Sequence, residues 1–382
     1  MGRWRRGGRK MSHLVAVGCS VLAATACTPT GHPPAQPPLL AYLGQSQVPF
    51  DATFENTVIG GLSAISYDAG RQLYYVISDD RSQRSPARFY TVQLSLSPKG
   101  IDKATFTGTR PLLDQSGQPF RPLQLNATPP VVPPDPEGIA FDPGRQRLYW
   151  SSEGERIAAG PVLEDPWVRI AGLDGTYLGQ FTLPPDLAMS AQQTGPRRNL
   201  ALEGLTLTPD GRWVFAAMED PGYNDGPASD DGHQVLTRVT KFEAATGTPI
   251  AQYAYPMDAP PPPADLNGVS DLVALSDTTF LVLERSDSVP PRVRIYRADV
   301  DAATDVSAVP SLQHAALTPM TKSLAADLGS TPGLGTPDNP TDNVEGITLG
   351  PKLPDGRQSV VLVTDNNFSP TQITQFLLFT MR

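Results

Sequence analysis

The stretch Glu137-GIAFDPGRQRLYWSSEG-Glu155 decides the fold, because it has the pattern of a β-hairpin. A short apolar strand is followed by a turn that carries Asp, Pro and Gly, and then by a second strand rich in aromatic and aliphatic side chains. Those three residue types favour the backbone angles of tight turns. The stretch therefore predicts two antiparallel strands whose outer ends lie at the same edge.

The same pattern occurs five times, with starting residues 64 to 78 positions apart. The copies cover residues 63–81, 137–155, 203–220, 267–287 and 345–367. Two further strand-like runs usually follow a copy, as Trp167-VRIAGL and Tyr177-LGQFTL do after the second. Four strands per repeat at this period are typical of a propeller blade. The sequence thus predicts an all-β propeller of four-stranded antiparallel blades around a central channel.

Five blades are detected and a divergent sixth stays open, because residues 300–343 are hard to assign. A β-sandwich is the alternative fold, but two packed sheets need no hairpin repeat of this length. The last copy has only one later strand, Gln372-ITQFLLF, and a strand near Leu39-LAYLG would complete that blade and close the ring. We therefore assign residues 39–382 to one propeller domain.

Residues 1–27 have the pattern of a secretory signal peptide. Five basic residues precede an apolar run from Leu14 to Ala26, which is too short to span a membrane. The run ends in Leu22-AATA-Cys27, a lipobox-like end in which Ala24 departs from the usual aliphatic residue. A Pro-rich tether follows at residues 28–38. We expect export to the cell envelope, with Cys27 lipidated and the lipid as the only membrane contact. Free secretion is the alternative.

Composition excludes several classes of site. Both cysteines lie in the leader, so the domain has no disulfide, thiolate metal site or Cys nucleophile. The chain has a net charge of −9 even though its leader is basic, so the part after the leader is more acidic still. This acidity disfavours nucleic-acid binding and favours metal cations. Only His233 and His314 follow the tether, which argues against a multi-His zinc site. No G-x-S-x-G elbow or P-loop occurs. We expect a monomer that acts on a small molecule.

Acidic residues gather at the predicted edge of the hairpins. In a propeller, the starts of first strands and the ends of second strands should ring the channel on one face. The first strands start with Ser63, Glu137, Glu203, Asn267 and Glu345. The second strands end with Asp79-Asp80-Arg81, Glu153, Glu219-Asp220, Glu284-Arg285 and Asp365-Asn366-Asn367. Two carboxylates about 4 Å apart repel by about 4 kcal/mol at an effective dielectric of 20, so such a ring needs cations.

Oxygen-only ligands suit a hard cation, and we expect Ca²⁺. The alternative for each Glu is a structural role in which it caps a strand or accepts backbone amides. Ser63 stands in a Glu position without a nearby His, and we interpret it as a small-residue substitution. The predicted metal ligands are Asp79, Asp80, Glu137, Glu153, Glu203, Glu219, Asp220, Asn267, Glu284, Glu345, Asp365 and Asn366.

The Glu-Gly starts, together with the endings Ser78-Asp-Asp-Arg81, Glu284-Arg285 and Asp365-Asn-Asn-Phe368, resemble the "esterase-like activity of phytase" family of phytase-like domain proteins. The resemblance covers residues 39–382. It implies a propeller, an exported bacterial or plastid setting, and hydrolysis of an ester or phosphoester. Propeller phytases bind several Ca²⁺ ions in an acidic cleft, where the metals hold phosphate and activate water.

By that resemblance, the candidate catalytic residues are Glu137, Glu203, Glu345, Arg81 and Arg285. Arg88 is a further candidate to contact phosphate, but three arginines are few for a substrate with six phosphates. Two functions therefore remain open. One is a metal-dependent hydrolase of phosphoesters, esters or lactones, and the other is a non-catalytic envelope propeller that binds a glycan, lipid or protein.

Overall fold

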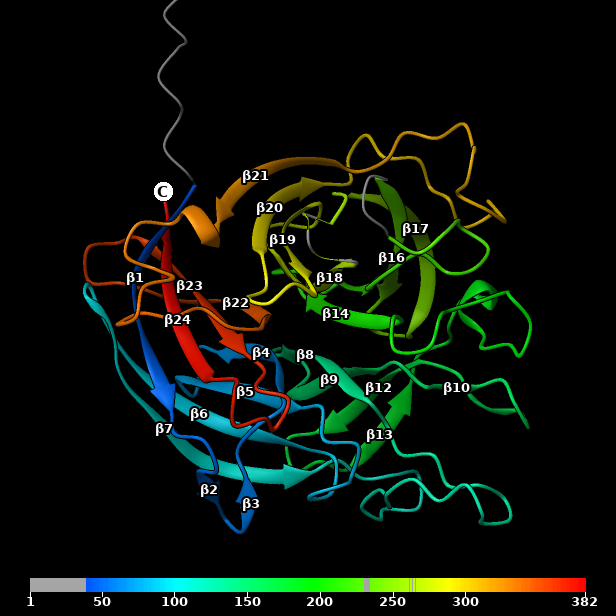
Figure 1. Ribbon diagram of the computed structural model, residues 1–382, viewed down its shortest axis with the longest axis horizontal. Helices are drawn as coiled ribbons and strands as arrows, with labels where there is room; N and C mark the ends of the chain where they lie inside the picture. Colours follow the sequence, from blue (N-terminus) through cyan, green and yellow to red (C-terminus); the bar gives the residue numbers. More distant parts are fainter. Residues whose placement is uncertain (1–38, 230–233, 261, 263, 265) are drawn as a thin grey trace, which may run out of the picture. The chain divides into compact units, whose positions relative to one another are not determined.

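Five four-stranded antiparallel sheets surround a common axis and form a propeller (Figure 1). The computed structural model describes residues 39–229, 234–260, 262, 264 and 266–382. The predicted signal peptide, Cys27 and the tether lie outside these residues. In the described part the helical elements are two 3₁₀ turns, η1 (Pro185–Leu187) and η2 (Leu328–Ser330). No helix there has the length and apolar character needed to cross a membrane.

The blades follow one another along the chain, and the strands of each blade succeed one another from the axis outward. Blade 1 contains β4 (Leu62–Asp68), β5 (Leu73–Ser78), β6 (Arg88–Ser97) and β7 (Gly100–Pro111). Blade 2 contains β8 (Pro136–Asp142), β9 (Arg147–Ser152), β12 (Trp167–Gly172) and β13 (Tyr177–Gln180). Blade 3 contains β14 (Leu202–Leu207), β15 (Trp213–Met218), β16 (Val235–Glu243) and β17 (Thr248–Met257).

Blade 4 contains β18 (Asn267–Ala274), β19 (Thr279–Ser286), β20 (Val293–Asp299) and β21 (Thr321–Asp327). Blade 5 contains β22 (Val344–Lys352), β23 (Gln358–Thr364), β24 (Thr374–Met381) and β1 (Leu40–Val48). Two short hairpins lie outside the blades, namely β2 (Thr53–Phe54) with β3 (Thr57–Val58) and β10 (Glu155–Ile157) with β11 (Val162–Glu164).

The predicted five blades are confirmed, and each predicted hairpin supplies the two inner strands of a blade. The inner strands contact one another in the order β4, β8, β14, β18, β22 and back to β4. The described residues leave no room in this ring for the sixth blade that the sequence left open. Residues 300–343 instead provide the outer strand β21 and its connecting loops.

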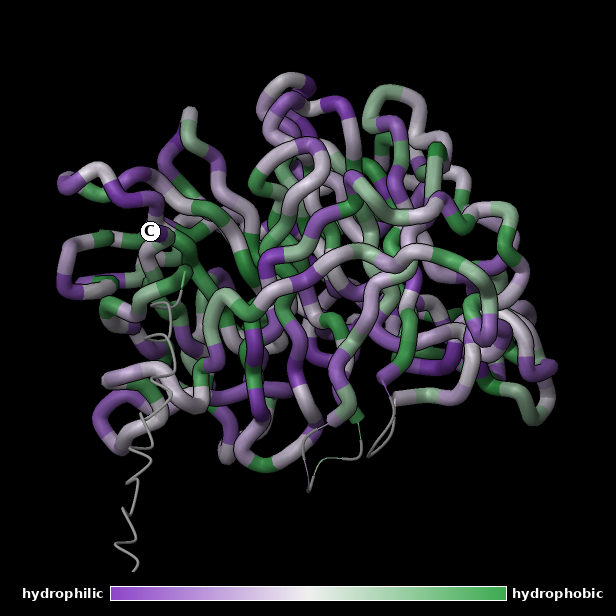
Figure 2. The backbone as a smooth tube through the Cα atoms, turned by 90° about the horizontal axis from the view of Figure 1, so that it is seen from above, coloured by the Kyte–Doolittle hydropathy of each residue, from purple (hydrophilic) through white to green (hydrophobic). Residues whose placement is uncertain are grey.

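The ring closes by pairing the two ends of the domain, as predicted. β1 pairs antiparallel with β24, from Leu40 opposite Met381 to Val48 opposite Thr374. This pairing completes blade 5 with a strand from the opposite end of the chain, so opening the ring requires breaking its hydrogen bonds. Figure 2 shows hydrophobic and hydrophilic stretches alternating along the backbone, with hydrophilic stretches in many of the outermost loops.

The core consists of apolar layers between neighbouring blades. Phe215 of blade 3 meets Phe280 of blade 4 with ring centroids 4.6 Å apart, and Tyr75 of blade 1 meets Phe141 of blade 2 at 5.2 Å. Similar clusters fill the other blade interfaces. The blades therefore hold one another rigidly, which is what fixes the inner strand ends around the axis.

The Glu-Gly motif has a steric cause. A Cβ at Gly138 would lie 2.5 Å from Leu205 Cβ in the next blade, and one at Gly204 would lie 2.7 Å from Leu272 Cδ2. Inner strands approach so closely at these points that a side chain has no space at the Gly positions. Each glycine therefore lets two blades pack together directly beside the Glu that precedes it.

Candidate functional site

The strand register shows which residues are equivalent between blades. Ile65 pairs with Val76, Ile139 with Trp150, Leu205 with Ala216, Leu272 with Val282, and Ile347 with Leu362. In each pair the first residue belongs to the innermost strand of a blade. The residues two positions before these, in blades 1 to 5, are Ser63, Glu137, Glu203, Ser270 and Glu345. The second residue of each pair belongs to the second strand. The residues three positions after these, in blades 1 to 5, are Asp79, Glu153, Glu219, Arg285 and Asp365. The axial positions of blade 4 are thus Ser270 and Arg285, where three of the other four blades carry two acids each.

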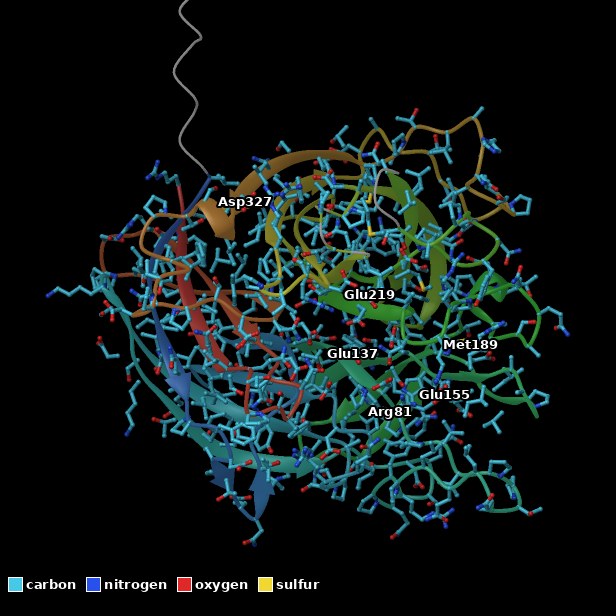
Figure 3. The ribbon with its side chains drawn as sticks, in the orientation of Figure 1. Arg81, Glu137, Glu155, Met189, Glu219 and Asp327 are labelled. Carbon is cyan, nitrogen blue, oxygen red and sulfur yellow. The ribbon has the colours of Figure 1, made fainter. Side chains whose placement is uncertain are left out.

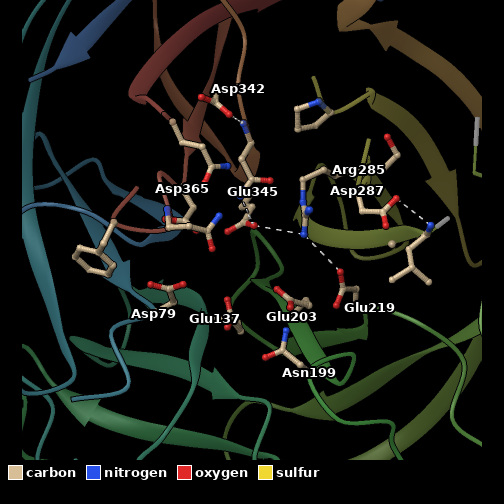
Figure 4. A pocket seen from close by; sticks show the side chains of 18 of the residues that line it. Asp79, Glu137, Asn199, Glu203, Glu219, Arg285, Asp287, Asp342, Glu345 and Asp365 are labelled. Carbon is tan, nitrogen blue, oxygen red and sulfur yellow. Dashed lines mark hydrogen bonds and ion pairs between the residues drawn. The ribbon is translucent and has the colours of Figure 1, made fainter. Parts of the chain in front are cut away.

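Seven of these ten side chains line a cavity of about 900 Å³ at one end of the axis. Figure 3 shows Glu137 and Glu219 near the centre of the ring, and Figure 4 shows the carboxylates around Arg285. Among the carboxylates that line the cavity are Asp79, Asp135, Glu137, Glu203, Glu219, Glu345 and Asp365. Glu153 is 1% exposed and lies against the same cluster. We call these eight residues the axial carboxylate cluster.

Two groups within the cluster have the spacing of a cation site. One carboxylate oxygen from each of Asp135, Glu137 and Glu153 lies within 4.8 Å of the others. The same holds for Glu153, Glu203 and Glu219. Glu153 belongs to both groups, so the two positions are adjacent.

Only two arginines contact the axial carboxylate cluster among the described residues. Arg285 lies 3.5 Å from Glu219 and 3.4 Å from Glu345. Arg81 lies 3.3 Å from Asp135 but is shared with Glu155, to which it donates at 2.9 Å. Two cations against eight carboxylates leave a large excess of negative charge.

Burial is the main cause of perturbed acidity in the cluster. It raises the pKa of Glu137, Glu153 and Glu203 well above the usual range, and neighbouring carboxylates raise it further. Burial also raises the pKa of Asp135 to about 6, against the effect of Arg81, and that of Glu219 to about 7, against the effect of Arg285. Ionisation of these groups is therefore unfavourable unless positive charge is added nearby.

Unpartnered oxygen atoms mark the same places. Glu153 accepts a hydrogen bond from the backbone N–H of Ala201 through Oε1, whereas Oε2 is buried and has no partner among the described residues. Asp365 accepts from Asn367 N–H at 2.7 Å through Oδ1, and its Oδ2 is likewise buried without a described partner. Buried carboxylate oxygens without donors are unfavourable unless a cation or a proton satisfies them. The donor set consists of oxygens alone, which fits a hard divalent cation.

Sequence comparison identifies the family of this chain. The profile of the phytase-like family, described as "Esterase-like activity of phytase", matches residues 57–368. The chain belongs to the phytase-like family. No curated protein sequence matches it significantly.

Several solved structures resemble this phytase-like propeller at low identity. The periplasmic gluconolactonase of Pseudomonas aeruginosa is 11% identical, with a TM-score of 0.34 over 84% of this chain and 85% of that chain. An engineered GH43 glycoside hydrolase is 12% identical, with a TM-score of 0.42 over 90% of this chain and 52% of that chain. A putative oxidoreductase (glucose dehydrogenase) of Thermus thermophilus is 14% identical, with a TM-score of 0.35 over 86% and 85%.

Seven of the twelve predicted ligands reach the cavity wall or the cluster behind it: Asp79, Glu137, Glu153, Glu203, Glu219, Glu345 and Asp365. Asp80 also borders the cavity, but its oxygens are fully engaged. They accept from the backbone N–H groups of Gln83, Arg84 and Ser85 and from Arg88 at 2.8 Å. Asp80 therefore shapes a loop of the phytase-like propeller and is not brought into the cluster.

Asn267 and Glu284 lie outside the cavity wall. In the second strand of blade 4 the axial residue is Arg285, which follows Glu284, and the first strand is shifted by three residues from the alignment that the sequence suggested. Its bulge falls at Ser270, so Asn267 precedes the axial position. Asn267 donates to Glu284 at 2.9 Å, and Glu284 also accepts from Lys322 at 2.5 Å and Tyr255 at 2.8 Å. The placement of these two residues at the axis was wrong, since they belong to a satisfied network.

Asp220 and Asn366 also lie off the cavity wall. Asp220 accepts from Ser229 N–H at 3.0 Å, and Asn366 Oδ1 accepts from the N–H of Gly61 at 3.2 Å and of Phe368 at 3.0 Å. Ser63 donates to the carbonyl of Glu137 at 3.0 Å. It thus links blades 1 and 2, which agrees with its interpretation as a small-residue substitution.

Sequence reasoning missed Asp135 and Asn343, which stand two residues before Glu137 and Glu345. Asn343 donates to Glu345 at 2.9 Å and orients it. The repeated polar residue at this offset was the signal that could have identified both. A third omission is Asp271, which stands in the Gly position of blade 4. It accepts from the N–H groups of Leu272 and Ile347 at 2.8 Å and so links the inner strands of blades 4 and 5.

Proposed function

We propose that this phytase-like propeller is a hydrolase of phosphoesters or carboxylic esters that uses Ca²⁺ held by the axial carboxylate cluster. The observation that carries the proposal is the pair of three-carboxylate groups that share Glu153. Their like-charge crowding has no sufficient counter-charge among the described residues. A binding site for a divalent cation removes that cost, and a proton is the alternative at low pH.

The residues that would hold cations are Asp135, Glu137 and Glu153 at one position and Glu153, Glu203 and Glu219 at the other. A bound divalent cation supplies positive charge to substrate oxygens and makes water more acidic. Glu345 belongs to neither group and is held by Asn343 and Arg285. Burial raises its pKa, so it suits the role of a base that accepts a proton from water near neutral pH. Arg285 offsets the charge of Glu219 and Glu345 beside the two cation positions.

The test is turnover by the full chain with p-nitrophenyl phosphate, p-nitrophenyl acetate and a panel of lactones. We expect hydrolysis of at least one substrate in millimolar Ca²⁺, loss of it in excess chelator, and recovery when Ca²⁺ is returned. Mg²⁺ should restore less, because it demands octahedral geometry and gives up its waters reluctantly. If Ca²⁺ binds without any turnover, the chain is a Ca²⁺-stabilised binding protein.

We also propose that the protein is exported and anchored through Cys27. The supporting features are the apolar run that ends in small residues and the Pro-rich tether after it. Mass spectrometry of protein purified from its native host should find an N-terminus at Cys27 that carries acyl chains. An unacylated N-terminus at another position would contradict anchoring and leave free secretion.

A further inference from the structure

The arginines that line the cavity differ in what they contact. Arg81 and Arg285 are each held between two carboxylates, and Arg88, named from the sequence, is buried against Asp80. Arg84 lines the same cavity and is exposed, and the described residues offer it no carboxylate partner. It is therefore the one cavity arginine whose charge is not already paired within the described part of the chain.

Arg84 is nevertheless held in place. Its guanidinium lies over the ring of Phe368 at 4.7 Å from the centroid and donates to the Phe368 carbonyl at 3.5 Å. Its backbone N–H donates to Asp80 at 3.1 Å, within the loop that Asp80 organises between β5 and β6. The backbone and the guanidinium of Arg84 are thus both held by neighbouring residues.

The Phe368 ring, which forms the platform under Arg84, is itself held in place. Phe368 has φ of 50°, a left-handed conformation that is unfavourable for a bulky residue. Its ring is pressed against the Gly60–Gly61 backbone, because a Cβ at Gly60 would lie 2.8 Å from Cδ1 and one at Gly61 would lie 2.7 Å from Cε2. The same Cβ at Gly61 would overlap Asp79 Oδ1. The platform therefore borders the axial carboxylate cluster, and strained residues of this kind concentrate at functional sites.

We infer that Arg84 binds the anionic group of the substrate, so that the site prefers a phosphate monoester to a neutral ester. The inference rests on the proposed function and names its substrate class. A stacked guanidinium keeps its N–H edges free, and two parallel N–H groups match the oxygens of a phosphate. Without such a cation, the excess carboxylates would repel a phosphate that approaches the cavity. Phe368 acts as a positioning residue.

The first test measures binding of inorganic phosphate to the full chain by calorimetry in saturating Ca²⁺. Arg84→Ala should weaken phosphate binding about tenfold, and Arg84→Lys should weaken it less, because Lys keeps the charge but loses the planar fork. Ca²⁺ affinity should change less than about twofold. Arg212→Ala is the matched control, since Arg212 is also exposed and lies over an aromatic ring, that of Trp213 at 5.0 Å, but does not line the cavity.

The second test separates substrate classes. Arg84→Ala should raise KM for p-nitrophenyl phosphate about tenfold and leave kcat within about threefold, with p-nitrophenyl acetate unaffected. Phe368→Ala should shift KM in the same direction, and Phe368→Tyr should restore it.

Unchanged phosphate affinity in Arg84→Ala, or equal losses for both esters, would overturn the role of Arg84. A rise in Ca²⁺ affinity alone would do so too, because it would show that Arg84 only balances charge. If the wild type hydrolyses neither ester and none of the lactones, the proposed function fails. The phosphate titration still decides whether Arg84 binds an anion.

Discussion

Replacing Glu153 with Gln is expected to abolish both Ca²⁺-dependent stabilisation and turnover. Gln keeps the shape and can still accept the hydrogen bond from Ala201 N–H, but both three-carboxylate groups lose the member that they share. In the wild type, Ca²⁺ at a hundredfold excess over its Kd should stabilise the fold by about 2.7 kcal/mol, and this gain should disappear in the variant. Turnover should fall by at least about a hundredfold.

The direction in which the melting temperature changes in chelator distinguishes a lost metal site from a damaged fold. Glu153 is buried among like charges, so its neutral replacement should raise the melting temperature of the metal-free protein, whereas a damaged fold would lower it. Glu284→Gln is the matched control, because Glu284 is also 1% exposed and lies near the end of the second strand of its blade but outside the axial carboxylate cluster. It should lose stability and keep its response to Ca²⁺. A Ca²⁺ response in Glu153→Gln equal to that of the wild type would remove the basis for the proposed metal site.

Replacing Arg285 with Met should destabilise the metal-free protein by about 3 kcal/mol or more, because it leaves buried carboxylates without their cation. Glu219 and Glu345 both lose the charge that faces them at 3.5 and 3.4 Å. Ca²⁺ should restore much of this loss by supplying positive charge at the same end of the axis. Melting temperatures in chelator and in millimolar Ca²⁺ measure both effects.

The stability of the metal-free protein should also depend on pH, in the wild type and in Arg285→Met. Burial raises the pKa of Glu219 to about 7 even with Arg285 opposing it, so the folded state binds more protons than the unfolded state between about pH 4 and 7. Stability in chelator should therefore rise as the pH falls from 8 toward 5, and more steeply in Arg285→Met.

Arg294→Met is the control for Arg285→Met. Arg294 has a similar exposure, 22% against 19%, and pairs with two acids outside the cavity. Its loss of stability should not respond to Ca²⁺. If both variants recover equally with Ca²⁺, the recovery does not come from the axial carboxylate cluster.

The hairpin repeat made the fold predictable. Turn residues, strand length and a regular period along the chain are local features, and five copies of the hairpin, usually followed by further strand-like runs, indicate the blades. The closing strand was also predictable, because the last repeat lacked a partner that only residues near Leu39 supplied. The same reasoning located acids at one edge of the hairpins, since both ends of a hairpin lie opposite its turn.

Only the structure shows which of two consecutive polar residues at a strand end faces the axis. Side chains alternate between the two faces of a strand, so Asp79 and Asp80, Glu219 and Asp220, or Asp365 and Asn366 cannot both face the axis. In each pair the first residue borders the cavity cluster, while the second is engaged by loop or backbone groups. A pattern of acids alone does not indicate this choice.

The sequence by itself determined the propeller architecture and the edge at which the acids gather, because these depend on local turn and strand patterns. The choice between five and six blades required the structure. Only the tertiary structure decided which side chains meet. In blade 4 the axial position of the second strand is Arg285, and Glu284 lies away from the axis, since one step along a strand reverses the direction of a side chain. The convergence of Asp135, Glu137 and Glu153 likewise depends on how rigid blades pack around a shared axis, and no local pattern encodes that packing.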